Sequence, residues 1–134
     1  MKIARLLLFT SLTFTLASCV NEDPIAPDTP DRNKFLGNWK VKEEIGMSSS
    51  IYLSTVTIDS SNTAGIKIGN IYNLGNAQTL KALVAGNTLD ISQQSVTGIL
   101  ISGNGTFSGT QCILNYSANE GGDPQTVKAT YTRP

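Results

Sequence analysis

The stretch Phe35-Leu36-Gly37-Asn38-Trp39-Lys40-Val41-Lys42-Glu43-Glu44-Ile45 decides the fold, and it contains the only tryptophan of the 134-residue chain. Its side chains alternate in character. One face of an extended chain would carry Trp39, Val41, Glu43 and Ile45, and the other face would carry Asn38, Lys40, Lys42 and Glu44. This two-residue period predicts a strand with one buried side and one solvated side.

Turn residues recur about every eight to twelve residues after this strand, which is typical of a sandwich or barrel of short strands. We expect strands at 37–45, 51–59, 64–72, 78–85, 88–94, 98–107, 111–117 and 127–133. No segment has a helical period apart from a short turn at 31–35. Because the connections resemble hairpins, we predict an all-β, eight-stranded antiparallel up-and-down β-barrel, with a two-sheet β-sandwich as the alternative. Gly103 and Gly105, inside a strand pattern, predict a bulge or a sharp bend.

Residues 1–18 read as a lipoprotein signal peptide. Lys2 and Arg5 precede an apolar segment, 6–16, which is shorter than the ~20 residues that a membrane-spanning helix needs. Leu16-Ala17-Ser18-Cys19 resembles the lipobox of bacterial lipoproteins, which implies cleavage before Cys19 and acylation (palmitate among the chains) of its thiol and amine. Two or three acyl chains make a stable membrane anchor. The alternative is an ordinary secretory signal with Cys19 as a free thiol.

Residues 19–33 read as a disordered tether, since prolines and acidic residues alternate there with few apolar ones. The pair Glu22-Asp23 resembles the export signals of surface lipoproteins in Bacteroidota-type bacteria, although a solvated spacer would have the same composition. Val20 after Cys19 departs from the inner-membrane retention pattern. We therefore expect a lipid anchor in the cell outer membrane, with surface exposure as one of two alternatives.

Composition excludes several classes of function. The chain has ten basic and ten acidic residues, and removal of Lys2 and Arg5 with the signal leaves eight basic against ten acidic. This balance gives no basic footprint for nucleic acid. With no histidine and only two cysteines, histidine-based catalysis and the usual zinc sites are excluded. We expect no catalytic, metal-ligating or cofactor-binding residues and no enzyme. Cys112 has no partner if Cys19 is acylated.

The opening strand also resembles a known family. Gly37-Asn38-Trp39, preceded by Phe35-Leu36, is similar to the Gly-x-Trp motif of the lipocalin and calycin superfamily, and Gly103-Asn104-Gly105-Thr106 is similar to a late Gly-x-Gly-Thr hairpin in small lipocalin-like lipoproteins of Bacteroidota-type bacteria. The resemblance implies a lipocalin-like barrel domain over 34–134. It also implies that Trp39 plugs the closed end beside Gly37, with Arg133 stacked over the indole.

Four residues are candidates for contact with a ligand. Glu43 shares the buried face of the first strand, and we expect it at the solvated rim. Tyr72, Gln93 and Tyr116 share the inward parity of their strands. One hypothesis is a binding module that takes a small apolar or amphipathic molecule at the open end. The other is a structural or interaction lipoprotein with a filled barrel, acting as an accessory to a surface complex. An interior cavity of ~300 Å³ or more would favour the first.

Overall fold

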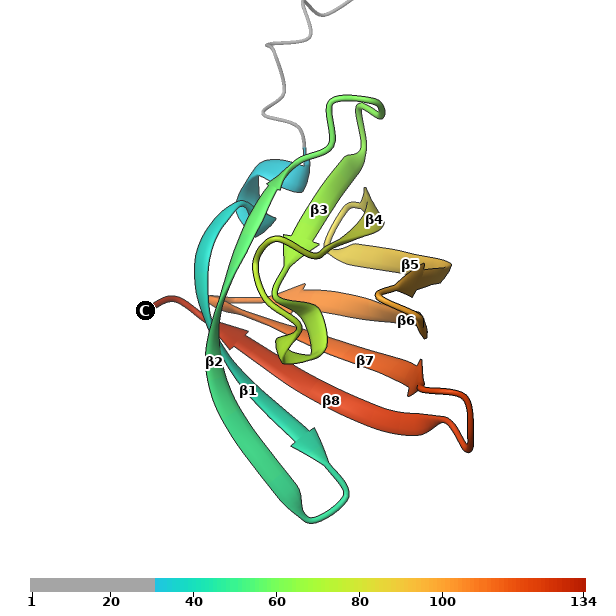
Figure 1. The fold of residues 1–134 in the computed structure, drawn as a ribbon. Coiled ribbons are helices and arrows are strands. Elements are labelled where there is room, and N and C mark those ends of the chain that lie inside the picture. Colours follow the sequence, from blue (N-terminus) through green and yellow to red (C-terminus); the bar gives the residue numbers. More distant parts are fainter. Residues whose placement is uncertain (1–30) are drawn as a thin grey trace, which may run out of the picture.

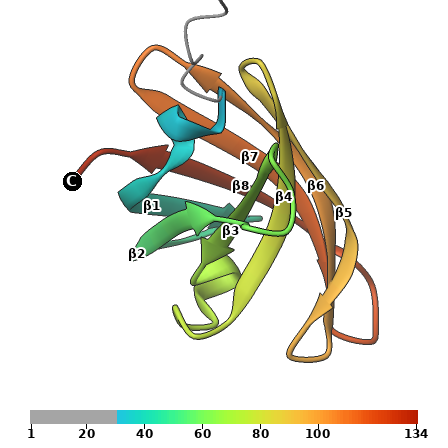
Figure 2. The ribbon, with the colours of Figure 1, turned by 90° about the horizontal axis from the view of Figure 1, so that it is seen from above.

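A computed structural model describes residues 31–134, so the predicted signal peptide, Cys19 and the predicted tether up to residue 30 lie outside the described residues. Eight antiparallel strands form one closed barrel in which each strand pairs with its neighbours in the sequence and β8 pairs with β1 (Figures 1 and 2). The predicted up-and-down barrel is confirmed over the sandwich. The strands are β1 (Gly37–Ile45), β2 (Ser48–Ile58), β3 (Gly65–Gly69), β4 (Thr79–Ala85), β5 (Thr88–Val96), β6 (Ile99–Ser108), β7 (Gln111–Asn119) and β8 (Gln125–Thr132).

Two expected boundaries differ from the structure near the start of the barrel. β2 begins at Ser48 because the first turn contains only Gly46 and Met47, so the hairpin is longer than expected. β3 ends at Gly69, and the residues expected to continue it form the short 3-10 helix η2 (Ile71–Asn73). Asn70 and Tyr72 have positive φ angles there, which interrupt an extended strand.

The 3-10 helix η1 (Asp31–Phe35) covers one end of the barrel, so the described domain starts three residues earlier than the expected boundary at residue 34. Arg32 fixes η1 by donating hydrogen bonds from Nη1 to the carbonyl oxygens of Asn62 (2.7 Å) and Gly65 (3.1 Å). Phe35 at its end is buried in the core. Residues 31–33, expected in the tether, therefore belong to the end cap of the barrel.

The barrel interior follows the two-residue alternation of the strands. In β1 the exposed and buried positions alternate from Asn38 to Glu43, and in β4 from Thr79 to Ala85. The inward side chains are almost all apolar and form one core. Among residues 31–134, neither short helix has the length and apolar character that crossing a bilayer requires.

The predicted irregularity at the β6 glycines lies partly on the facing strand. The register of β5 and β6 shifts between Ile91 and Gln94, which makes β5 the bulged strand. Gly103 and Gly105 lie in the middle of β6 and pair with both β5 and β7, so the Gly-x-Gly-Thr segment is not a hairpin. A Cβ atom on Gly103 would lie only 2.6 Å from Cα of Tyr116, so the close approach of β6 to β7 requires glycine.

The ladders between strands are uneven in length. β1 and β2 pair along the whole of β1, but β2 pairs with β3 only at residues 56–58. β4 and β5 pair only from Leu83 to Ala85, and beyond this the amide of Gln94 bonds to both backbone groups of Lys81 (2.9 and 2.8 Å). The closed barrel therefore has two short strand-to-strand ladders, β2–β3 and β4–β5.

We predict that Gly103→Ala destabilises the domain by about 1–3 kcal/mol, because the new methyl group overlaps the β7 backbone. Urea unfolding followed by Trp39 fluorescence measures the change. Gly122→Ala is the matched control, since a Cβ there meets nothing within 4 Å. Equal midpoints for the two variants would contradict the packing argument.

Candidate functional site

The closed end of the barrel is built around Trp39. Its indole is buried, and Nε1 donates a 2.7 Å hydrogen bond to the carbonyl oxygen of Phe35 in η1. The rings of Phe107 and Tyr131 meet it edge-on, with centroids 6.3 Å away. Trp39 therefore joins the end cap to β1, β6 and β8, and its position leaves it inside the core.

Arg133 lies on the outer side of the same indole. Its guanidinium carbon is 3.6 Å from the ring centroid, which is a close cation–π contact. Nη1 donates to the carbonyl oxygens of Leu36 (2.8 Å) and Asn38 (3.3 Å), and Nη2 donates to that of Lys34 (2.9 Å). A Cβ on Gly37, whose φ is +105°, would lie 3.0 Å from Nη1. Gly37 thus leaves room for the arginine that ties the end of the chain to the start of β1.

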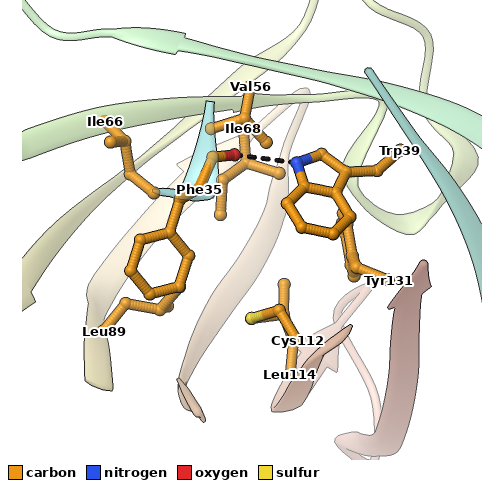
Figure 3. A pocket seen from close by; sticks show the side chains of 9 residues that line it. All are labelled: Phe35, Trp39, Val56, Ile66, Ile68, Leu89, Cys112, Leu114 and Tyr131. Carbon is orange, nitrogen blue, oxygen red and sulfur yellow. Dashed lines mark hydrogen bonds between the residues drawn. The ribbon is translucent and has the colours of Figure 1, made fainter. Parts of the chain in front are cut away.

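The void beside Trp39 is small. Its volume is about 10 Å³, the space of a single water molecule, whereas ligand pockets measure about 300–1,000 Å³. Figure 3 shows its side chains converging from η1 and the surrounding strands: Phe35, Trp39, Val56, Ile66, Ile68, Leu89, Cys112, Leu114 and Tyr131. Apolar groups therefore fill this half of the interior.

The other half of the interior contains a polar cluster centred on Glu43. The carboxyl group is only 4% exposed, so the expected position at a solvated rim is wrong. Its Oε2 accepts hydrogen bonds from the hydroxyls of Tyr52 (2.5 Å) and Tyr116 (2.7 Å). A buried polar group is costly unless it is hydrogen-bonded, and the two phenols supply those bonds from β2 and β7.

Two more polar side chains lie in the interior next to this cluster. Ser54 is buried and donates a 2.6 Å hydrogen bond from Oγ to the carbonyl oxygen of Gly69. The hydroxyl of Tyr131 is buried and has no hydrogen-bond partner among residues 31–134. Burial raises the pKa of Tyr52, Tyr116 and Tyr131 well above the ordinary phenol value, and the negative charge of nearby Glu43 adds to the shift.

The structure separates the four candidate ligand residues. Glu43 and Tyr116 are in direct contact, and Tyr72 is half-buried in η2 against the core. Gln93 is on the exterior, beside an outer groove of about 170 Å³, because the β5 bulge reverses the parity after Ile91. Tyr52 was missed, although it shares the parity of Val56, which is buried on the same strand.

Burial raises the pKa of the Cys112 thiol to about 12, so the thiol is neutral at physiological pH. The residue packs as a small apolar side chain against Leu114 and Tyr131 at the void (Figure 3). The thiol borders a void of about 10 Å³, which is too small for a substrate, and Glu43 does not line that void. The site geometry is that of a polar core, and its chemistry is hydrogen bonding.

Part of the outer surface is hollowed and positively charged. A depression of about 490 Å³ lies on the outer face of β1, β2 and β8. Lys40, Lys42 and Lys128 line it, together with Glu44 and Ile51. Lys42 and Glu44 form a solvated ion pair of 3.7 Å, which contributes little to stability.

We predict a steep loss of stability above about pH 10. The raised pKa values keep Tyr52, Tyr116 and Tyr131 neutral in the folded state, while the unfolded chain ionises near the ordinary value of 10.0. The stabilisation is complete below pH 10 and falls above it by about 1.4 kcal/mol per pH unit for each tyrosine. Urea midpoints from pH 8 to 11 test this, with ultraviolet absorbance reporting ionised phenol. Phenol ionisation of all four tyrosines before unfolding would contradict it.

Comparison with family models and with curated proteins finds no match for the chain.

Proposed function

We propose that this protein is a lipid-anchored interaction module of the cell outer membrane, whose filled, lipocalin-like barrel acts through its outer surface as an accessory to a surface complex. The observation that carries the proposal is the void beside Trp39, which at about 10 Å³ is the space left among the apolar side chains that fill this half of the interior. A ligand of even modest size needs about thirty times that volume. The barrel interior is therefore better suited to be a structural core that supports the outer surface than to be a ligand-binding cavity.

The Glu43 cluster supports the same reading. Here Tyr52 and Tyr116 both donate to one oxygen of Glu43, and the three side chains are buried together. Their hydrogen bonds connect β1, β2 and β7 across the interior, so the cluster holds the sheet in shape.

The membrane anchor rests on the sequence, since Cys19 lies outside the described residues. The lipobox-like segment and the Pro-rich, acidic residues that follow it support acylation at Cys19 and display from the outer membrane. The described domain adds the exposed surface on which an accessory would act. No catalytic step, cofactor or metal is part of this proposal.

The ligand hypothesis is tested by asking whether a small molecule co-purifies with the protein. We expect native mass spectrometry of the detergent-extracted protein to show the acylated chain alone, and N-phenyl-1-naphthylamine to give no fluorescence increase beyond that in the same detergent without protein. Leu114→Ala is the matched control, because it enlarges the apolar void and should admit xenon while costing about 2–5 kcal/mol. A stoichiometric small-molecule adduct on the unmodified sequence would overturn the filled-barrel proposal.

The anchor is tested separately by metabolic labelling with an alkyne analogue of palmitate. We expect label in the outer-membrane fraction for the protein with its native sequence and none for Cys19→Ser, because the thiol that accepts the lipid is gone. Cys112→Ser serves as the control, since this buried thiol is not the expected acceptor. Label that persists in Cys19→Ser would refute the anchor.

A further inference from the structure

The β1–β2 hairpin has a free backbone edge. β2 has eleven residues and β3 has five, and β3 reaches only residues 56–58 of β2. At Leu53 the edge is covered, because Asn70 donates a 2.7 Å hydrogen bond from Nδ2 to its carbonyl oxygen. From Ser48 to Tyr52 no other strand lies beside it, and Figure 1 shows the hairpin tip projecting beyond the rest of the barrel.

The register of the hairpin determines which backbone groups are free. Ile45 and Ser48 face each other across a two-residue turn, and such a pair exchanges both hydrogen bonds. Hydrogen-bonded and non-bonded pairs alternate along the ladder, so the N–H and C=O groups of Ser50 and Tyr52 point toward β1. Those of Ser49 and Ile51 point away from β1 and have no partner among residues 31–134.

This edge lacks the usual protection against pairing. Natural edge strands are blunted by charged residues, proline or bulges. The free segment Ser48-Ser49-Ser50-Ile51-Tyr52 has none of these, and its register with β1 is regular. Ile51 and Leu53 on its outer face are 64% and 61% exposed, and Met47 at the tip is fully exposed. An uncharged edge beside exposed apolar side chains is suited to a second strand.

We propose that two copies of this protein pair through these edges, with the β2 strands antiparallel and a two-fold axis at Ser50. The inference rests on the proposed function, since it names the partner of the interaction module. Ser49 of one copy then faces Ile51 of the other, and the two pairs exchange four N–H···O=C hydrogen bonds. The pairing uses every free group from Ser48 to Tyr52 and stops before Leu53, whose carbonyl already accepts a bond from Asn70.

The charges on the outer face add a weak preference for this register. β1 places Lys42 beside Ile51 and Glu44 beside Ser49. With the axis at Ser50, Lys42 and Ile51 of one copy lie in the same row as Ser49 and Glu44 of the other copy. The two ends of each row therefore carry unlike charges. An axis at Ile51 would put the Lys42 residues of the two copies at the ends of one row, and an axis at Ser49 would do the same with the Glu44 residues. In each alternative the like charges lie about 14 Å apart with two strands between them, so their repulsion adds only a weak preference for the Ser50 axis.

A ladder of four hydrogen bonds is too short for a tight dimer in dilute solution, since stable interfaces bury about 1,200–2,000 Å². Copies anchored in one membrane are confined to a thin layer, which raises their effective concentration without any new contact. We therefore expect pairing at the membrane and weak association of the extracted protein.

Disulfide trapping tests the register in the full chain in its own membrane, with Cys112→Ala removing the native thiol of the domain. At the axis the two Ser50 residues form a non-bonded pair with Cα atoms about 4.5 Å apart, a separation that a disulfide spans. We expect Ser50→Cys to give a dimer of twice the mass at least tenfold faster than Ser48→Cys under mild oxidation. The Ser48 residues of the two copies would be separated by about 13 Å along the strands.

A second variant tests the hydrogen bonds themselves. Ile51→Pro removes an N–H that points to the second copy and leaves the bonds between β1 and β2 intact, so it should slow trapping of Ser50→Cys at least tenfold. Ile51→Val is the matched control, and circular dichroism checks that each variant folds. Equal trapping of Ser50→Cys and Ser48→Cys, no dimer, or a cross-link to a different protein would overturn the proposal, the last in favour of a foreign strand.

The two proposals fail separately. If lipid labelling is absent but Ser50→Cys still traps a dimer in concentrated extract, the anchor is wrong and the pairing stands. If labelling occurs and the barrel is empty of ligand, but Ser50→Cys traps nothing, only the edge inference is wrong.

Discussion

The contact between Arg133 and Trp39 is the constraint on which the rest of the barrel depends. The guanidinium lies 3.6 Å from the indole centroid and donates to backbone carbonyls of Lys34, Leu36 and Asn38. It therefore ties the last residues of the chain to the segment between η1 and β1, where a barrel of sequential hairpins must close. The indole in turn bonds to Phe35 and fills the space behind it. Closure by Arg133 and filling by Trp39 thus occur in one contact between two side chains, which explains why so little volume remains at this end of the barrel.

The polar half of the interior shows how a small barrel can contain a carboxyl group without a binding function. Glu43 is on the inward face of β1 and has no cation near it in the described core. Tyr52 and Tyr116 donate to it from two other strands, so the desolvation of one polar group is offset by two hydrogen bonds. Such a cluster also specifies register, because a shift of β1 by one residue would move Glu43 to the outer face and leave both phenols unpaired.

Much of the fold could be predicted from sequence because the two-residue alternation is strong where ladders are long. The bounds of β1 matched, and the up-and-down order followed from the short turns. The prediction was wrong where local backbone geometry overrides parity: the β5 bulge moves Gln93 to the exterior, and the positive φ angles at Asn70 and Tyr72 end β3 early. Glu43 was expected at a rim because it lies two residues from the end of β1. That distance says nothing about which phenols converge on the carboxyl group. Tyr52 could have been found by extending the parity of Val56 back along β2.

The free edge of β2 follows from the same shortening of β3. A five-residue strand cannot cover an eleven-residue neighbour, and the chain after Gly69 turns into η2, where Asn70 covers only the carbonyl of Leu53. The first half of β2 therefore keeps unpaired backbone groups. Natural edge strands ordinarily protect such groups with charge. The serines at positions 48–50 supply no such protection, whereas the adjoining β1 face has Lys40, Lys42 and Glu44. The edge supplies backbone bonds for a second strand, and the bond from Asn70 to the Leu53 carbonyl limits how far such a strand can extend, while the charges of β1 add a weak preference for one alignment.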